Sequence, residues 1–286
     1  MRALQTFILL ILVGLVSWTV ASNTQVAATV NNSKDLYNTI RDRGVIRCGY
    51  FDEAPFTITD MSNNTRTGFS VELVEEIASQ NGLKVEWVAP INFSTWLEDL
   101  QNGRYDLLCG STFAIPRGEG KVDYTIPYAY ALLGAYTRPD MSKFDNNLKA
   151  LNDENVTFSA TDGDGYTLIK RKLFPQAKEY NLPSDIDISQ LLIGVAGKKA
   201  DVALVLKSLF MNFDKANPGI LREVVMEQPV YTYPITFGLR PHENTFRQFL
   251  DTNIRTMLAT GELQAIYDKY VTDDSMGVIL PRRPYE

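Results

Sequence analysis

Between Ile46 and Tyr128 the chain carries three segments, in a fixed order, that limit its fold more than any other feature. They are IRCGYFDEAPF (46–56), GFSVELVEEIA (68–78) and YDLLCGSTFAIPRGEGKVDYTIPY (105–128). The first predicts a buried strand that ends in a turn, and the second predicts a helix entered through Gly68. The third predicts a strand that runs into a loop with a fixed positive charge, Arg117. A strand end beside a loop arginine is where a parallel sheet builds a small-anion site.

The rest of the chain also alternates short apolar strands with amphipathic helices, which indicates an α/β fold. The sequence predicts strands over 105–109, 156–160 and 201–206, and helices over 187–196, 245–260 and 262–271. The segment Thr95-Trp96-Leu97-Glu98 predicts a capping box at the start of a further helix. The loop 160–165 lies between a strand and a helix, and Asp164 suits the N-cap of that helix.

Composition and charge exclude several classes of function. The net charge is −6 and no long Lys/Arg run occurs, which argues against nucleic acid or an anionic membrane as a partner. His242 is the only histidine, which argues against most zinc sites and against a His-based catalytic triad. We therefore expect neither a metal nor a cofactor.

The first residues predict export from the cytoplasm. Arg2, an apolar run from Phe7 to Val20 and the small residues Ala21 and Ser22 fit a secretory signal peptide over residues 1–22. The apolar run is short for a helix that spans a membrane. An uncleaved N-terminal anchor is the alternative interpretation, and the sequence leaves the cleavage site open.

The order and the residues of the three segments resemble those of the bacterial extracellular solute-binding proteins of family 3, the periplasmic receptors of amino-acid ABC transporters. The segment GELQAIYDKY (261–270) also resembles the C-terminal helix of that family. The resemblance implies a two-lobed type II periplasmic-binding-protein fold, with a cleft between lobes that two strands, near 130–136 and 230–238, connect. It implies lobe 1 from 35–132 and 235–286, lobe 2 from 133–234, and a monomer that docks on a membrane permease.

The resemblance also implies the residues that hold a ligand in lobe 1. Arg117 follows Thr112 by the family's spacing and would bind a carboxylate with two parallel hydrogen bonds, with the Gly110 backbone beside the ligand. Phe93 stands where the family places an aromatic ring over the ligand side chain. Each of these residues also has a purely structural interpretation, as a surface arginine or a core aromatic residue.

Acidic residues in two loops are candidates for a ligand's cationic group. Asp52 and Glu53 follow the first strand, in a loop that faces the cleft in the family, and carboxylates there accept from ammonium or guanidinium groups. From lobe 2, the resemblance implies that the loop with Thr161 and Asp162 faces the same cleft. Asp162 is a second candidate for an ammonium.

Leu206 departs from the family pattern. Members that bind α-amino acids often have an acidic residue at the end of this strand, where it binds the α-ammonium. An unpaired buried ammonium costs on the order of several kcal/mol. Either Asp162 or Asp52 replaces the missing acid, or the ligand has no ammonium and is a simple organic acid.

The chain is therefore predicted to be a receptor for a small carboxylate-bearing solute, most often an amino acid in this family. A cyclohexadienyl-dehydratase-like enzyme on the same scaffold is an alternative, although such an enzyme commonly has its general acid where this chain has Leu206. A module that docks to a separate sensor is another. In the resembled fold the strands of Cys48 and Cys109 lie side by side, and the sequence leaves open whether the two cysteines form a disulfide.

Overall fold

The computed structural model describes residues 35–114 and 120–283. One continuous mixed sheet runs through the molecule in the order β4-β1-β5-β12-β7-β10-β8-β9, and β6, β11 and β13 pair beside this path. A separate hairpin is formed by β2 and β3. The strands are β1 Val45–Tyr50, β2 Ile58–Asp60, β3 Thr65–Thr67, β4 Lys84–Pro90, β5 Leu107–Phe113, β6 Asp123–Tyr124, β7 Ala129–Thr137, β8 Thr157–Thr161, β9 Lys178–Leu182, β10 Val202–Leu206, β11 Arg222–Glu223, β12 Tyr231–Leu239 and β13 Val278–Ile279.

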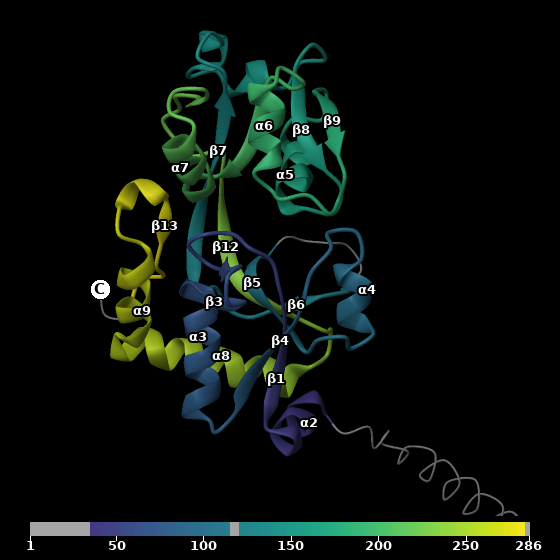
Figure 1. Ribbon diagram of the computed structural model, residues 1–286, viewed down its shortest axis with the longest axis vertical. Coiled ribbons are helices and arrows are strands. Elements are labelled where there is room, and N and C mark those ends of the chain that lie inside the picture. The colour runs from purple at the N-terminus through teal and green to yellow at the C-terminus, as the bar shows by residue number, and fades with distance from the viewer. Residues whose placement is uncertain (1–34, 115–119, 284–286) are drawn as a thin grey trace, which may run out of the picture.

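Helices cover the sheet in two separate groups, so the molecule has two α/β lobes (Figure 1). In Figure 1, α2, α3, α4 and α8 surround β1, β4 and β5, whereas α5, α6 and α7 lie in the other lobe with β8 and β9. These three helices all contact β10. The helix α9 packs on α3 and α8, so the C-terminal part of the chain returns to the first group. The helices are α2 Leu36–Arg43, α3 Phe69–Gln80, α4 Trp96–Gln101, α5 Gly165–Leu173, α6 Gln190–Ala196, α7 Lys207–Ala216, α8 Asn244–Thr260 and α9 Glu262–Tyr270, with 3-10 turns at Ser142–Phe144, Leu148–Leu151 and Asp274–Met276.

Two long strands connect the lobes. The strands β7 and β12 are antiparallel, with register from Tyr231 opposite Leu133 to Ile235 opposite Ala129, and they run from one lobe into the other (Figure 1). Together they join the two halves of the sheet, because β12 pairs with β5 of the first lobe and β7 pairs with β10 of the second. The two-lobed fold with two crossing strands, predicted from the sequence, is confirmed. The division at residues 132/133 and 234/235 stays a prediction, and the segment 1–22 lies outside the described residues.

A disulfide between Cys48 and Cys109 answers the question that the sequence left open. Cys48 lies in β1 and Cys109 in β5, their Cα atoms are 5.5 Å apart, and both residues are fully buried. These two parallel strands are paired at Cys48 opposite Leu107 and at Gly49 opposite Leu108. The bond therefore joins neighbouring strands in the core of the first lobe.

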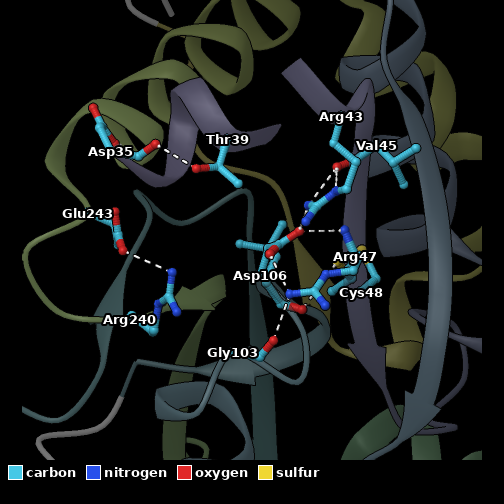
Figure 2. Close-up of polar contacts among 12 residues, drawn as sticks. Asp35, Thr39, Arg43, Val45, Arg47, Cys48, Gly103, Asp106, Arg240 and Glu243 are labelled. Atoms are coloured by element: carbon cyan, nitrogen blue, oxygen red, sulfur yellow. Dashed lines mark hydrogen bonds and ion pairs between the residues drawn. A yellow bond between two sulfur atoms is a disulfide. The ribbon is translucent and has the colours of Figure 1, made fainter. Parts of the chain in front are cut away.

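A buried carboxylate holds the opposite end of the same two strands (Figure 2). Asp106, just before β5, is 1% exposed and accepts a hydrogen bond from the Arg47 backbone N–H at 2.8 Å. It also forms ion pairs with the guanidinium groups of Arg43 and Arg47. Arg47 donates in addition to the Gly103 carbonyl at 2.6 Å. The charge of Asp106 is thus compensated by two cations and a backbone donor, and removing Asp106 would leave these groups without their acceptor.

Two local predictions differ from the structure. The helix α4 does begin at Trp96, but the Thr95 side chain makes no cap hydrogen bond and instead donates to Asp99 at 3.3 Å. The capping box is therefore wrong, because Thr95 has a helical backbone conformation that turns its hydroxyl away from the first free N–H groups. The strand β5 reaches Phe113, past the predicted end at residue 109, because β12 supplies partners for Thr112 and Phe113.

Candidate functional site

A cavity lies between the lobes, beyond the carboxyl ends of β1 and β5 and against the start of α5. Its walls include the aromatic residues Phe51, Phe93, Trp96, Phe113, Tyr124 and Tyr166. A small set of polar side chains also lines it, from Glu53, Ser111, Thr112 and Asp164. An apolar cavity with a few converging polar groups is the usual form of a small-molecule site.

The two walls of the cavity are in direct contact. Gly163, in the loop before α5, has a φ of +87°, and a Cβ added to it would lie 2.0 Å from the Phe93 carbonyl oxygen across the cleft. Glycine is required there, because any side chain would collide with the opposite wall. The hydroxyl groups of Ser94 and Ser184 also form a hydrogen bond from one lobe to the other. The structure is thus a closed arrangement of the lobes.

Glu53 is the most unusual group in the cavity. It is 2% exposed, and its two carboxyl oxygens accept hydrogen bonds from the hydroxyls of Ser111 and Tyr166. Burial raises the pKa of Glu53 to about 7; the two hydroxyls act in the opposite direction, and the nearby Asp164 raises it further. Within residues 35–114 and 120–283, no lysine or arginine forms an ion pair with Glu53.

The sequence after β1 holds Glu53 in place by backbone bonds. Glu53 and Thr57 exchange hydrogen bonds across a tight turn, with the Glu53 N–H donating at 2.9 Å and the Thr57 N–H at 3.1 Å. The first N–H groups of α3 then donate to the carbonyls of Pro55 and Phe56, at 2.9 and 3.0 Å. Gly68 permits this approach, because a Cβ there would lie 2.3 Å from the Phe56 carbonyl oxygen.

The start of α5 brings a second polar group to Glu53 from the other lobe. Asp164 caps this helix, accepting from the backbone N–H groups of Tyr166 at 2.6 Å and Thr167 at 3.0 Å, so the predicted N-cap is confirmed. The cap fixes Tyr166 in the first turn, where its ring lies 5.4 Å from that of Phe113. Burial holds the pKa of Tyr166 well above its usual range, so its hydroxyl is a donor to Glu53.

Three of the predicted site residues line this cavity, and a fourth supports it. Glu53, Phe93 and Thr112 are in the walls, and Phe93 makes an edge contact with Phe51 at 5.6 Å between ring centroids. Gly110 lies behind the Phe51 ring, since a Cβ on Gly110 would be 3.2 Å from a carbon of that ring. The Gly110 carbonyl accepts from the Tyr128 hydroxyl at 3.4 Å.

The structure places three other predicted residues outside the cavity walls. Asp52 accepts from the Thr59 hydroxyl at 2.7 Å and lines a neighbouring hollow beside Phe51. Thr161 is buried, and its hydroxyl donates to the Pro183 carbonyl at 2.9 Å. Asp162 is mostly exposed and forms an ion pair with Arg171 at 2.7 Å.

Two further predictions have different outcomes. Arg117 lies outside the described residues, so its role toward a carboxylate stays a prediction. Leu206 is fully buried at the end of β10, opposite Leu133 of β7. This apolar side chain, which departs from the family pattern, is therefore part of the packed core.

Most residues of the cavity wall were not predicted from the sequence, and Tyr166 and Ser111 are among them. One signal was present for Ser111, because it lies in the same strand segment as two predicted site residues, Gly110 and Thr112. No comparable signal marks Tyr166, whose hydroxyl meets Glu53 only because the two lobes close.

Comparison with known families and structures gives consistent matches. Residues 46–273 match the family described as bacterial extracellular solute-binding proteins, family 3. Among curated relatives are a probable histidine-binding protein of Campylobacter jejuni, 25% identical over 54% of this chain and 57% of that protein, and the L-cystine-binding protein TcyA of Bacillus subtilis, 24% identical over 85% and 88%. The match thus spans little more than half the length of the first of these relatives.

Solved structures show the same fold. A cysteine-binding protein from Campylobacter jejuni has a TM-score of 0.72 at 19% identity, covering 87% of this chain and 100% of that chain. The ancestral amino acid-binding protein AncCDT-1, described as a precursor of cyclohexadienyl dehydratase, has a TM-score of 0.71 at 22% identity, covering 82% and 99%. In the part of the chain that the structure describes, no helix is long and apolar enough to cross a membrane.

Proposed function

Because the chain belongs to the bacterial extracellular solute-binding proteins of family 3, we propose that it is a receptor that closes its two lobes over a free amino acid. The observation that carries this proposal is Glu53, a buried carboxyl group without a cationic partner among the described residues, in an aromatic cavity between the lobes. Relatives with amino acids in their names, histidine and L-cystine, support the same class of ligand.

Glu53 supplies the acid that the apolar Leu206 does not. A ligand ammonium placed against Glu53 gives this carboxylate an opposite charge that no residue of 35–114 or 120–283 supplies, in surroundings of low dielectric where such a pair is strong. The aromatic rings around it cover the ligand's side chain and exclude water. Asp52 and Asp162, the two acids proposed from sequence, lie outside the cavity walls and have partners in Thr59 and Arg171.

The ligand's carboxylate is assigned to Arg117 and Thr112. A guanidinium matches a carboxylate with two parallel hydrogen bonds, and Thr112 lies in the cavity wall five positions before Arg117. Changing Arg117 to Ala should cost about 2–5 kcal/mol of binding free energy, a loss of roughly 30- to 5,000-fold in affinity. Arg104→Ala, which removes an exposed arginine of the same lobe, is the matched control. Near-normal affinity in folded Arg117→Ala protein would reject this assignment.

We further propose that the receptor is a periplasmic monomer that delivers its ligand to the permease of an ABC transporter. The family's extracellular location supports this placement. A signal peptide over residues 1–22 and the docking of the closed form on a permease belong to the same proposal. No chemical change of the ligand is expected.

A screen of purified protein against the common amino acids, keto acids and dicarboxylates tests the proposal. A ligand present at 100 times its Kd should stabilise the protein by about 2.7 kcal/mol in thermal unfolding. The cognate amino acid should also reduce the radius of gyration in solution scattering, if the free protein samples open forms. Tenfold tighter binding of a keto acid or dicarboxylate than of every amino acid would overturn the amino-acid assignment. Dehydrated product in excess over protein, found by mass spectrometry, would indicate the dehydratase alternative.

A further inference from the structure

The polar centre of the cavity depends on two neighbouring strands of lobe 1 that have little regular pairing where they reach it. Phe51 and Glu53 follow the end of β1, and Ser111, Thr112 and Phe113 are the last residues of β5. The register between β1 and β5 ends at Gly49 opposite Leu108, before either strand reaches the cavity. Backbone pairing between these two strands therefore stops short of the residues that must meet.

The other side of β5 is irregular at the same point. The strand β12 pairs Gly238 with Leu108 and Thr236 with Thr112, so Cys109, Gly110 and Ser111 stand opposite Phe237 alone. Such a bulge bends a strand and redirects its side chains, and bulges are common beside functional sites. Ser111 lies in this bulge, and its hydroxyl contacts Glu53.

One covalent bond crosses between the strands at this irregular point. Cys109 is the first residue of the bulge, and its disulfide partner Cys48 is next to the last β1 residue in register with β5. Both cysteines are completely buried, and Gly110, the residue after Cys109, packs behind the Phe51 ring. At Cys109–Ser111, regular backbone pairing with β1 and with β12 is interrupted and does not fix the distance between β1 and β5. The disulfide fixes that distance instead.

We propose that Cys48 and Cys109 are positioning residues of the binding site, whose disulfide holds the ends of β1 and β5 so that Glu53 meets Ser111 in the geometry that receives the ligand. This role deepens the proposed function and rests on it for its effect on affinity. Without the bond, the bulged segment and the turn at Glu53 can separate, and part of the binding energy is then spent on bringing them together.

The test compares wild-type protein with the variant Cys48→Ala/Cys109→Ala, using the full exported chain. Affinity for the amino acid found in the screen should fall by roughly tenfold or more in the variant, because a preorganised site becomes a mobile one. The control is Ile254→Ala, which removes a buried side chain of the same lobe that does not line the cavity. It lowers stability as well, but the affinity of the folded protein should stay within about twofold of wild type.

A spectroscopic signature separates positioning from general stability and needs no ligand. Carbon-13 NMR of the Glu53 carboxyl, assigned with Glu53→Gln, should titrate near pH 7 in wild type and in Ile254→Ala. In the double-alanine variant the titration should move toward 4.5, because the separated loop admits water to Glu53. If the double-alanine variant fails to fold, Cys48→Val/Cys109→Ala restores buried volume without the bond and is measured in the same two ways.

The outcomes distinguish this inference from the proposed function. If wild type binds an amino acid and the folded disulfide variant keeps both the affinity and the titration of Glu53, the positioning role is wrong and the receptor function stands. If wild type binds no amino acid, the receptor proposal fails, whereas a shifted Glu53 titration in the variant still supports the structural half of the inference. If neither cysteine variant folds, reduced wild-type protein that remains folded and keeps the Glu53 titration would overturn the inference, and a lowered titration would support it.

Discussion

Two buried carboxyl groups lie at opposite ends of the strand pair β1 and β5, and they differ in what surrounds them. Asp106 is 1% exposed and is met by two guanidinium groups and a backbone N–H (Figure 2). Glu53 is 2% exposed and is met by two hydroxyls. A buried charge that already has cationic partners needs no further one, whereas a buried acid without a cation has a raised pKa and is available to a ligand. The comparison supports the proposal that the ligand binds at the Glu53 end.

The largest expected effect is on ligand affinity at the uncompensated end. Glu53→Gln keeps the shape of the side chain and can still bond both hydroxyls, accepting from one and donating to the other, but it removes the negative charge. We expect a loss of about 2–5 kcal/mol of binding free energy for an amino acid, since one partner of a desolvated charge pair is removed. Titration calorimetry measures this loss. Asp52→Asn, the neighbouring acid outside the cavity walls, is the matched control and should bind almost as wild type does.

The deaminated analogue of the ligand sharpens the same experiment. If Glu53 binds the ammonium, the Gln variant should lose far more affinity for the amino acid than for its analogue without the amino group. Equal losses for the two compounds would mean that Glu53 supports the cavity without contacting the ammonium.

The next effect is on stability at the compensated end. Asp106→Ala leaves two arginines without their partner and the Arg47 N–H without its acceptor. Both arginine side chains are about a third exposed, 31% and 30%, so water can solvate them in part. We expect a loss of about 1.5–3 kcal/mol in the free energy of unfolding, the range for hydrogen bonds to charged groups. Urea unfolding measures this loss. The folded variant should bind the ligand as tightly as wild type does, unlike Glu53→Gln.

A smaller effect should appear when pH is varied. Glu53 has a pKa of about 7 in the folded protein against an ordinary value of 4.5, so the free folded state binds more protons than the unfolded chain between these values. The contribution of Glu53 to stability is therefore fully present below pH 4.5 and is lost as pH rises through 7. Affinity for a ligand with an ammonium group should change in the opposite direction, because protonated Glu53 has no charge to pair with it. We expect this affinity to fall by about tenfold for each pH unit below 7.

Calorimetry and thermal unfolding from pH 5 to 8 check both slopes, with Glu53→Gln as the control that should flatten them. An affinity that does not change between pH 5 and 7, in a wild-type protein that still binds its ligand, would contradict the assignment of the ammonium to Glu53.

The smallest effect is expected at Asp162. Its side chain is 73% exposed and its ion pair with Arg171 is at the surface, where such pairs contribute about 0–1 kcal/mol. Asp162→Asn should therefore change ligand affinity by less than about 0.5 kcal/mol, the usual range for surface substitutions. A larger loss of affinity for the amino acid, with no loss for its deaminated analogue, would indicate that Asp162 and not Glu53 binds the ammonium.

The sequence by itself determined the fold class and much of the location of the site. Hydrophobic periodicity and glycine positions are local signals, so strands β8 and β10 and helices α8 and α9 were predicted within about one residue of their ends. The family resemblance brought Glu53, Phe93 and Thr112 to the cleft, and they line the same cavity. The helix α7 was not predicted, because its polar and apolar residues begin directly after a buried strand with no capping residue between them.

Only the tertiary structure decided which acid has no cationic partner in the part of the chain that the structure describes. Asp52, Glu53 and Asp162 are all carboxylates in loops after strands, and nothing local distinguishes them. Their difference comes from partners distant in the chain: Glu53 meets Tyr166 of the other lobe, and Asp162 turns outward to Arg171. The disulfide was likewise open, because the approach of Cys48 to Cys109 depends on how β1 and β5 pair. Burial and charge compensation are sums over the whole fold, and a pKa that depends on them cannot be assigned from residue type and spacing.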